Sequence, residues 1–346
     1  MSVEEFEIGK SPEEILMESA NESWRNPEHS VFIVSENKDL NYKECYDREI
    51  AISKEIFNEI SSVANQEIPP GKYILFVDMA DPGSMGNPKL TAIDQDRLEK
   101  MFEAETGSPD TTQDFQPANM RHCFGFLPND TRFVTVKPFK EEMPADLNGC
   151  VGIILSGSET NIKDEQIPER IAMTKKVLAF VLNAKQLGIP MFGICFGSQL
   201  LNSVFRATVD WIRDLNTEEQ LEETGLVLLQ KTDLGKQAGS ALEQLPDQFY
   251  VHASHKQEVL AESMPEELEI LAKSDTSQVQ IVRLKNSDMI WAIQNHIECG
   301  DTRADVINSM YGVANKDPHL FQNESSKARR VLCPNFLKIA GAFSKK

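Results

Sequence analysis

The sequence lacks the cysteine spacings that hold metal ions or cross-link extracellular folds. Its six cysteines are scattered, and no two of them form a C-x-x-C pair. We therefore expect neither a zinc site nor a disulfide framework, and a reducing, cytoplasmic setting. The first residues carry no basic stretch followed by an apolar one, so no signal peptide is expected. No apolar run is long enough to cross a bilayer, and we expect no membrane association, metal or cofactor.

Basic residues are also scarce. The chain has 35 Lys and Arg against 54 Asp and Glu, a formal net charge of −19. A nucleic-acid-binding protein needs a basic face to neutralise phosphates, so this class of partner is not expected. Hydrophobic residues make up 40% of the 346 residues and charged residues 26%, which is typical of a soluble globular protein with a full core.

The charge is unevenly distributed, which indicates the domain organisation. Residues 1–70 contain 16 acidic and 6 basic side chains, a net −10, and leave −9 for the rest of the chain. We interpret 1–70 as an acidic, helical N-terminal extension with one strand over 31–34. A break at Pro69-Pro70-Gly71 precedes the main domain, residues 71–315. Within it, residues 79–130 are interpreted as a long insertion with a helix near 94–105, and 316–346 as a C-terminal helix and tail.

Strand and helix patterns alternate in the first part of the main domain. Short apolar runs predict strands at 73–78, 133–136, 150–155 and 191–194, and a one-sided apolar pattern predicts a helix over 168–187. Such units give a parallel sheet with reactive groups at the carboxyl ends of its strands. Further strands are predicted at 226–229, 249–251, 268–271, 279–282 and 289–293. The fold class is therefore α/β, with a mostly parallel central sheet.

The segment from Gly193 to Gln199 lies between a predicted strand and a predicted helix, with Cys195 at the turn. This is the pattern of a nucleophile elbow, in which the reactive atom stands at the end of the strand and faces the first N–H groups of the helix. The helix dipole favours a thiolate there. A lone cysteine is more often a buried structural residue. The flanking glycines and the turn position favour the nucleophile instead.

The segment Gly193 to Gln199 also fills every fixed position of Gly-x-Cys-x-Gly-x-Gln, and so resembles the elbow of the class I (triad) glutamine amidotransferase family. Three further segments resemble this family: Leu155-Ser156-Gly157-Ser158, Ala253-Ser254-His255, and Gln294-Asn295-His296-Ile297-Glu298. Ile297 replaces the proline usual in the last motif. The resemblance implies a flavodoxin-like amidotransferase sandwich and a triad of Cys195, His296 and Glu298.

Physical chemistry favours the same roles. His296 and Glu298 lie two residues apart at a strand end, so both side chains can leave one face. The carboxylate would orient the imidazole, which would take the thiol proton of Cys195. The backbone N–H groups of Gly157 and Phe196 are the candidate oxyanion donors. The candidate substrate-binding residues are Ser156, Gln199 and His255; for His255 a structural role is an alternative.

These features predict a glutamine amidotransferase-like amidohydrolase, which cleaves the glutamine side-chain amide through a γ-glutamyl thioester on Cys195. The resemblance implies that the ammonia passes to a separate synthase partner, because the flanking segments are too short for a synthase domain. Two alternatives stay open. One is a self-sufficient γ-glutamyl hydrolase or peptidase, and the other is a catalytically inactive binding or regulatory module.

Overall fold

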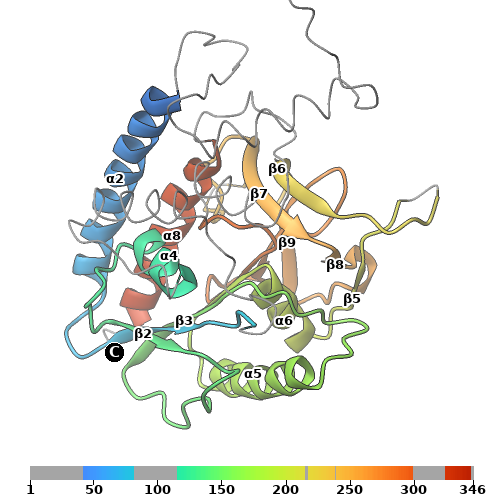
Figure 1. The fold of residues 1–346 in the computed structure, drawn as a ribbon, viewed down its shortest axis with the longest axis horizontal. Helices are drawn as coiled ribbons and strands as arrows, with labels where there is room; N and C mark the ends of the chain where they lie inside the picture. The colour runs from blue at the N-terminus through green and yellow to red at the C-terminus, as the bar shows by residue number, and fades with distance from the viewer. Residues whose placement is uncertain (1–41, 82–114, 215–216, 238, 299–323, 344–346) are drawn as a thin grey trace, which may run out of the picture.

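The structure is a computed structural model that describes residues 42–81, 115–214, 217–237, 239–298 and 324–343. Its centre is a nine-stranded sheet with the strand order β2-β1-β3-β4-β11-β10-β9-β6-β7, accompanied by a two-stranded sheet of β5 and β8 (Figure 1). The strands of the large sheet are β1 (Tyr73–Val77), β2 (Phe133–Val136), β3 (Cys150–Leu155), β4 (Met191–Ile194), β6 (Glu223–Lys231), β7 (Gln248–His255), β9 (Leu268–Lys273), β10 (Ile281–Leu284) and β11 (Ile290–Ile293). The small sheet pairs β5 (Val209–Trp211) with β8 (Gln257–Val259).

The two halves of the large sheet differ in direction. From β2 to β11 every neighbouring pair is parallel, whereas β10, β9, β6 and β7 continue the sheet by antiparallel pairing. The helix α5 (Pro168–Gln186) connects β3 to β4, as expected for a parallel crossover. The prediction of an α/β fold with a mostly parallel sheet is confirmed.

Helices cover both faces of the parallel half. Alternate residues of β1 belong to two separate hydrophobic clusters, with Ile74 and Phe76 in one and Leu75 and Val77 in the other. The first cluster includes buried residues of α2 (Tyr42–Glu67), α4 (Phe115–Cys123) and α8 (Glu324–Phe343). The second includes residues of α5 and α6 (Phe196–Val204). This two-sided burial explains why these strands are continuous apolar runs.

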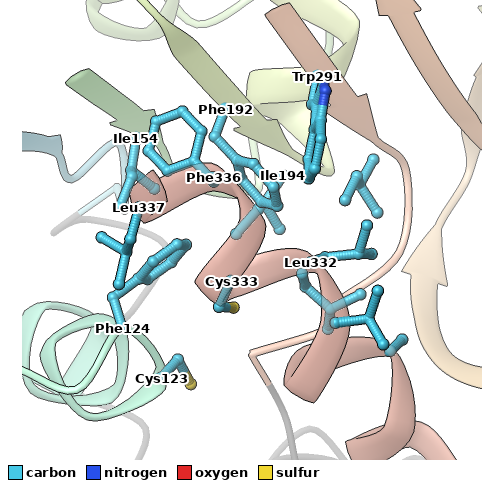
Figure 2. Packing of buried hydrophobic residues seen from close by; sticks show 14 of the residues in the cluster. Cys123, Phe124, Ile154, Phe192, Ile194, Trp291, Leu332, Cys333, Phe336 and Leu337 are labelled. Carbon is cyan, nitrogen blue, oxygen red and sulfur yellow. The ribbon is translucent and has the colours of Figure 1, made fainter. Parts of the chain in front are cut away.

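The C-terminal helix α8 is part of the core. Phe336 is fully buried, and its ring centroid lies 5.2 Å from that of Phe192 in β4 and 6.1 Å from that of Phe124, which directly follows α4 (Figure 2). On the outer side of α8, Arg330 pairs with Glu55 and Glu59 of α2 at 3.4 and 3.6 Å. Segments near the two ends of the described chain therefore complete one helical layer together.

Several predicted elements differ from the observed ones. The strand predicted at 279–282 is observed at 281–284, and its pairing with β9 shifts register between Ile281 and Val282. The helix α4 lies within the segment interpreted as an insertion, and the sequence pattern did not reveal it. The strand expected at 31–34 and the helix expected at 94–105 lie outside the described residues. Among the helices of the described ranges, none has the length and apolar character needed to cross a bilayer.

Candidate active site

Three neighbouring parallel strands end at the same edge of the sheet. Strand β4 lies between β3 and β11, with Gly193 opposite Leu155 and Ile194 opposite Ile293. Ser156 directly follows β3, Cys195 follows β4, and Gln294 follows β11. The topology thus brings together three sequence motifs, of which the second follows the first by 39 residues and the third follows the second by 99 residues.

The backbone at Cys195 forms a sharp elbow. Its φ of 51° and ψ of −109° lie in a region that non-glycine residues rarely occupy, and it is the N-cap of α6. A Cβ on Gly193 would lie 2.5 Å from the carbonyl oxygen of Gly197, and one on Gly197 would lie 2.5 Å from that of Leu155. Both positions therefore require glycine for the turn to close. Cys195 itself is 6% exposed.

His296 and Glu298 form a close pair beside the elbow. The Nδ1 of His296 lies 2.7 Å from Oε1 of Glu298, and its side chain also interacts with that of Cys195. Burial disfavours the charged imidazolium, but the carboxylate of Glu298 and the thiolate of Cys195 outweigh burial and raise the pKa of His296 well above its ordinary value. The side chain of His296 is 21% exposed, whereas that of Glu298 is 6% exposed.

The two residues whose N–H groups are candidate oxyanion donors, Gly157 and Phe196, both lie close to Cys195. A Cβ on Gly157 would lie 3.4 Å from Cβ of Cys195 and 3.0 Å from Cε1 of His296, so the backbone of Gly157 faces both side chains. Phe196 is the first residue of α6, where backbone N–H groups have no partner within the helix. Gly157 and Phe196 thus both lie next to Cys195, and their N–H groups remain the candidate oxyanion donors.

Ser156 acts on the backbone of the loop that follows β3, residues 156–167, which we call the strand-end loop. Its Oγ accepts a hydrogen bond from Met79 N at 2.8 Å and donates one to Gly157 O at 2.7 Å. Its carbonyl oxygen accepts from Gly197 N at 3.0 Å. Ser156 is fully buried, so these contacts fix the start of the loop against the elbow.

The other two candidate substrate-binding residues also have partners within the protein. Gln199 Nε2 donates to Gln257 O at 3.0 Å and lies 3.3 Å from Gln294 Oε1. Both ring nitrogens of His255 are used, Nε2 with Glu223 Oε2 at 2.7 Å and Nδ1 with Gln257 O at 3.0 Å. These contacts support the structural role considered for His255.

Sequence reasoning missed three residues around the site. Gln257 and Glu223 form the polar contacts behind the elbow helix, and the thiol of Cys123 donates to the backbone oxygen of Glu298 at 2.9 Å. Cys123 is 175 residues from Glu298, and no local pattern connects them. The neighbouring residues His122 and Cys123 carry no motif in the sequence, yet Cys123 contacts the backbone of the triad candidate Glu298. Within the described residues, no group of three or more His, Cys, Asp or Glu side chains is arranged to hold a metal ion.

An elbow cysteine beside a histidine–carboxylate pair, at the strand ends of a parallel sheet, has the geometry expected of an activated nucleophile with its base. Comparison with known proteins gives the family. The model for glutamine amidotransferase class-I matches residues 118–307. The match covers more than half of the chain, and the chain belongs to this family.

Individual relatives are distant. The protein is similar to one subunit of the glutamine-hydrolyzing GMP synthase of Methanopyrus kandleri, with 26% identity over 147 residues that span 42% of this chain and 66% of that one. A glutamine amidotransferase structure from Thermotoga maritima superposes with a TM-score of 0.51 at 17% identity, over 79% of this chain and 97% of that one. This superposition shows a shared fold and confirms the predicted amidotransferase sandwich.

Proposed function

We propose that this protein hydrolyses the side-chain amide of glutamine through a γ-glutamyl thioester on Cys195. The observation that carries the proposal is the juxtaposition of three adjacent strand ends: the elbow at Cys195, the backbone of Gly157 and the His296–Glu298 pair. Membership of the class I amidotransferase family supports the same chemistry.

The raised pKa of His296 sets the starting state of the proposed reaction. An imidazolium held by Glu298 can pair with a thiolate, which is the nucleophilic form of a cysteine. The thiolate attacks the amide carbon of glutamine, and the carbonyl π electrons move to the oxygen. The N–H groups of Gly157 and Phe196 then donate to this oxyanion, a contribution of about 3 kcal/mol for each donor in comparable enzymes.

The imidazolium completes the first half of the reaction as a general acid. It gives its proton to the amide nitrogen as the C–N bond breaks, so that ammonia leaves and the thioester remains. His296, now neutral, takes a proton from water, and the resulting hydroxide attacks the thioester. Glutamate leaves as the C–S bond breaks, and the thiolate–imidazolium pair is restored.

We further propose that the ammonia serves a separate synthase subunit. The similar protein of Methanopyrus kandleri is named as a subunit of a glutamine-hydrolysing synthase, and this supports the proposal. We expect the protein to act in the cytoplasm.

The test is ammonia release by the purified full chain from glutamine and from γ-glutamyl peptides. Cys195→Ala should abolish release, and Cys150→Ala should retain it. Cys150 is a suitable control because burial raises the pKa of its thiol to about 11, so it is not a thiolate at neutral pH. For the same reason a glutamine-analogue electrophile should label Cys195 and leave Cys150 unmodified.

The other outcomes separate the alternatives. Glutamine turnover that appears only when a synthase subunit is added supports the subunit role. Turnover of γ-glutamyl peptides alone would replace the proposal with a self-sufficient γ-glutamyl hydrolase. If no substrate is turned over and the analogue does not label Cys195, the protein is a binding module.

A further inference from the structure

Gln257 is buried at a junction of four parts of the structure. It is the first residue of β8, is 2% exposed, and pairs with Trp211 across the small sheet. It contacts the strand-end loop, the elbow helix α6 and the His255–Glu223 pair. None of these contacts is local in sequence except the one to His255.

The side-chain amide of Gln257 holds the strand-end loop. Its Oε1 accepts hydrogen bonds from the backbone N of Ile162 at 2.9 Å and of Lys163 at 3.2 Å. Its Nε2 donates to the carbonyl oxygen of Lys163 at 2.9 Å. One side chain thus satisfies three backbone groups of a loop that has no strand or helix partner there.

The backbone carbonyl of Gln257 is bound on the opposite side. It accepts from Gln199 Nε2 of the elbow helix and from His255 Nδ1, both at 3.0 Å. His255 Nε2 lies 2.7 Å from the carboxylate of Glu223, so both ring nitrogens face oxygen atoms. Burial of Glu223 opposes its ionisation, but the hydrogen bond and charge of His255 outweigh burial and lower the pKa of this carboxyl. A buried ion pair therefore fixes the backbone from which the Gln257 side chain extends.

We infer that Gln257 is a positioning residue, which holds the strand-end loop at the distance from the elbow helix that places the Gly157 N–H over the thiol of Cys195. The inference rests on the proposed function. Gly157 lies five residues before Ile162 in this loop, and Ser158 and Thr160 link the two points through a hydroxyl–hydroxyl hydrogen bond of 2.9 Å. Ser156 holds the start of the loop and Gln257 holds residues 162 and 163, so Gly157 lies between two anchored points, and loss of the Gln257 anchor should loosen the segment that contains it.

The outer side of the loop has separate supports, so the chain should fold without the Gln257 contacts. Arg170 of α5 binds Asp81 Oδ2 at 2.8 Å and the carbonyl oxygen of Glu159 at 3.2 Å. Trp211 Nε1 donates to Asp164 Oδ2 at 2.9 Å on the exposed side. This last contact provides a matched control, because Trp211→Phe removes one bond to the same loop and leaves those of Gln257.

The most informative variant is Gln257→Glu, because glutamate has the same side-chain shape as glutamine and keeps an oxygen in the position of Oε1, which accepts the two loop hydrogen bonds. The second oxygen then faces the Lys163 carbonyl and repels it while the carboxyl is ionised, but a protonated carboxyl donates as the amide does. A displacement of about 1 Å at a reacting centre costs on the order of a hundredfold in rate. A shift of the loop by about half this distance should therefore lower kcat for glutamine about tenfold at neutral pH. The ratio of variant to wild-type kcat should rise as the pH falls. The kcat of Gln257→Leu should stay low at every pH, and the kcat of Trp211→Phe should match that of the wild type.

Two further readouts separate positioning from general disruption. The rate at which iodoacetamide alkylates Cys195 should be unchanged in Gln257→Glu, because the thiol and its histidine are not displaced. Hydrogen exchange in a peptide covering 156–167 should be faster in Gln257→Glu than in Trp211→Phe. A wild type that turns over no substrate would refute the proposed function, and the exchange result alone would then decide whether Gln257 holds the loop. Unchanged exchange, a pH-independent kcat ratio, or a parallel loss of alkylation would overturn the inference.

Discussion

The substitution Gly157→Ala tests the geometry of the site with the addition of one methyl group. The new Cβ would lie 3.0 Å from Cε1 of His296 and 3.4 Å from Cβ of Cys195. Carbon atoms in contact are ordinarily separated by about 3.5–4.0 Å. The imidazole must therefore move by about 0.5 Å, against its 2.7 Å hydrogen bond to Glu298.

The expected cost follows from that displacement. Misplacement of a reacting group by about 1 Å costs on the order of a hundredfold in rate, so a shift of half this size should lower kcat about tenfold. The fold should tolerate the change, because the methyl group meets a histidine side chain that is 21% exposed rather than the interior of the core. Steady-state ammonia release and thermal unfolding of the same preparation measure the two effects.

The matched control is Gly152→Ala, in β3, the strand that leads into the loop containing Gly157. Its Cβ would lie 2.9 Å from Cδ1 of Ile74 and 3.1 Å from Cζ of Phe336, both in the core. Overpacking of this kind typically destabilises by about 1–3 kcal/mol. Gly152→Ala should therefore lower Tm and leave kcat unchanged, whereas Gly157→Ala should lower kcat and leave Tm unchanged. An unchanged kcat in Gly157→Ala, or a fall in kcat that Gly152→Ala reproduces, would refute the proposed geometry.

Three other predictions concern charge and packing. Glu298→Gln removes a carboxylate that raises the pKa of His296, so the loss of kcat at alkaline pH should begin at a lower pH in the variant; identical pH profiles would contradict this. The pKa of Glu223 is lowered by folding, so its contribution to the free energy of unfolding is present above pH of about 4.3 and is lost as the pH falls through the lowered value. The stability difference between wild type and Glu223→Gln, measured by urea unfolding, should therefore shrink below about pH 4, and a constant difference would refute the ion pair. Phe336→Ala should lower the free energy of unfolding by about 3–5 kcal/mol, because this ring is fully buried against β4. A loss of less than about 1 kcal/mol would show that α8 contributes little to the core.

The sequence predicted the parallel half of the sheet because its strands are buried on both faces. Buried strands such as β3 and β4 are continuous apolar runs, and the turns that end them contain glycines with strict steric requirements. The elbow at Cys195 was predictable for the same reason: a strand, a tight turn and a helix leave a local pattern. The pairing of Cys195 with His296 was expected only through the family resemblance, because β4 and β11 are far apart in the chain and become neighbours only in the sheet.

The polar contacts behind the site left no local signal. Gln257 reaches Lys163 across 94 residues, and Cys123 reaches Glu298 across 175. A glutamine or cysteine in a short strand or helix is compatible with many environments, and only the three-dimensional arrangement shows which backbone groups it satisfies. The antiparallel half illustrates the same limit, because Gln280, next to β10, reaches Glu223 across 57 residues.

The most direct measurement is mass spectrometry of the full chain after acid quenching during turnover of glutamine. We predict that the peptide containing Cys195 gains the mass of one γ-glutamyl group, that hydroxylamine removes it, and that Cys195→Ala never acquires it. Ammonia release from glutamine by a protein that carries no adduct at Cys195, and that keeps its activity in Cys195→Ala, would contradict the account.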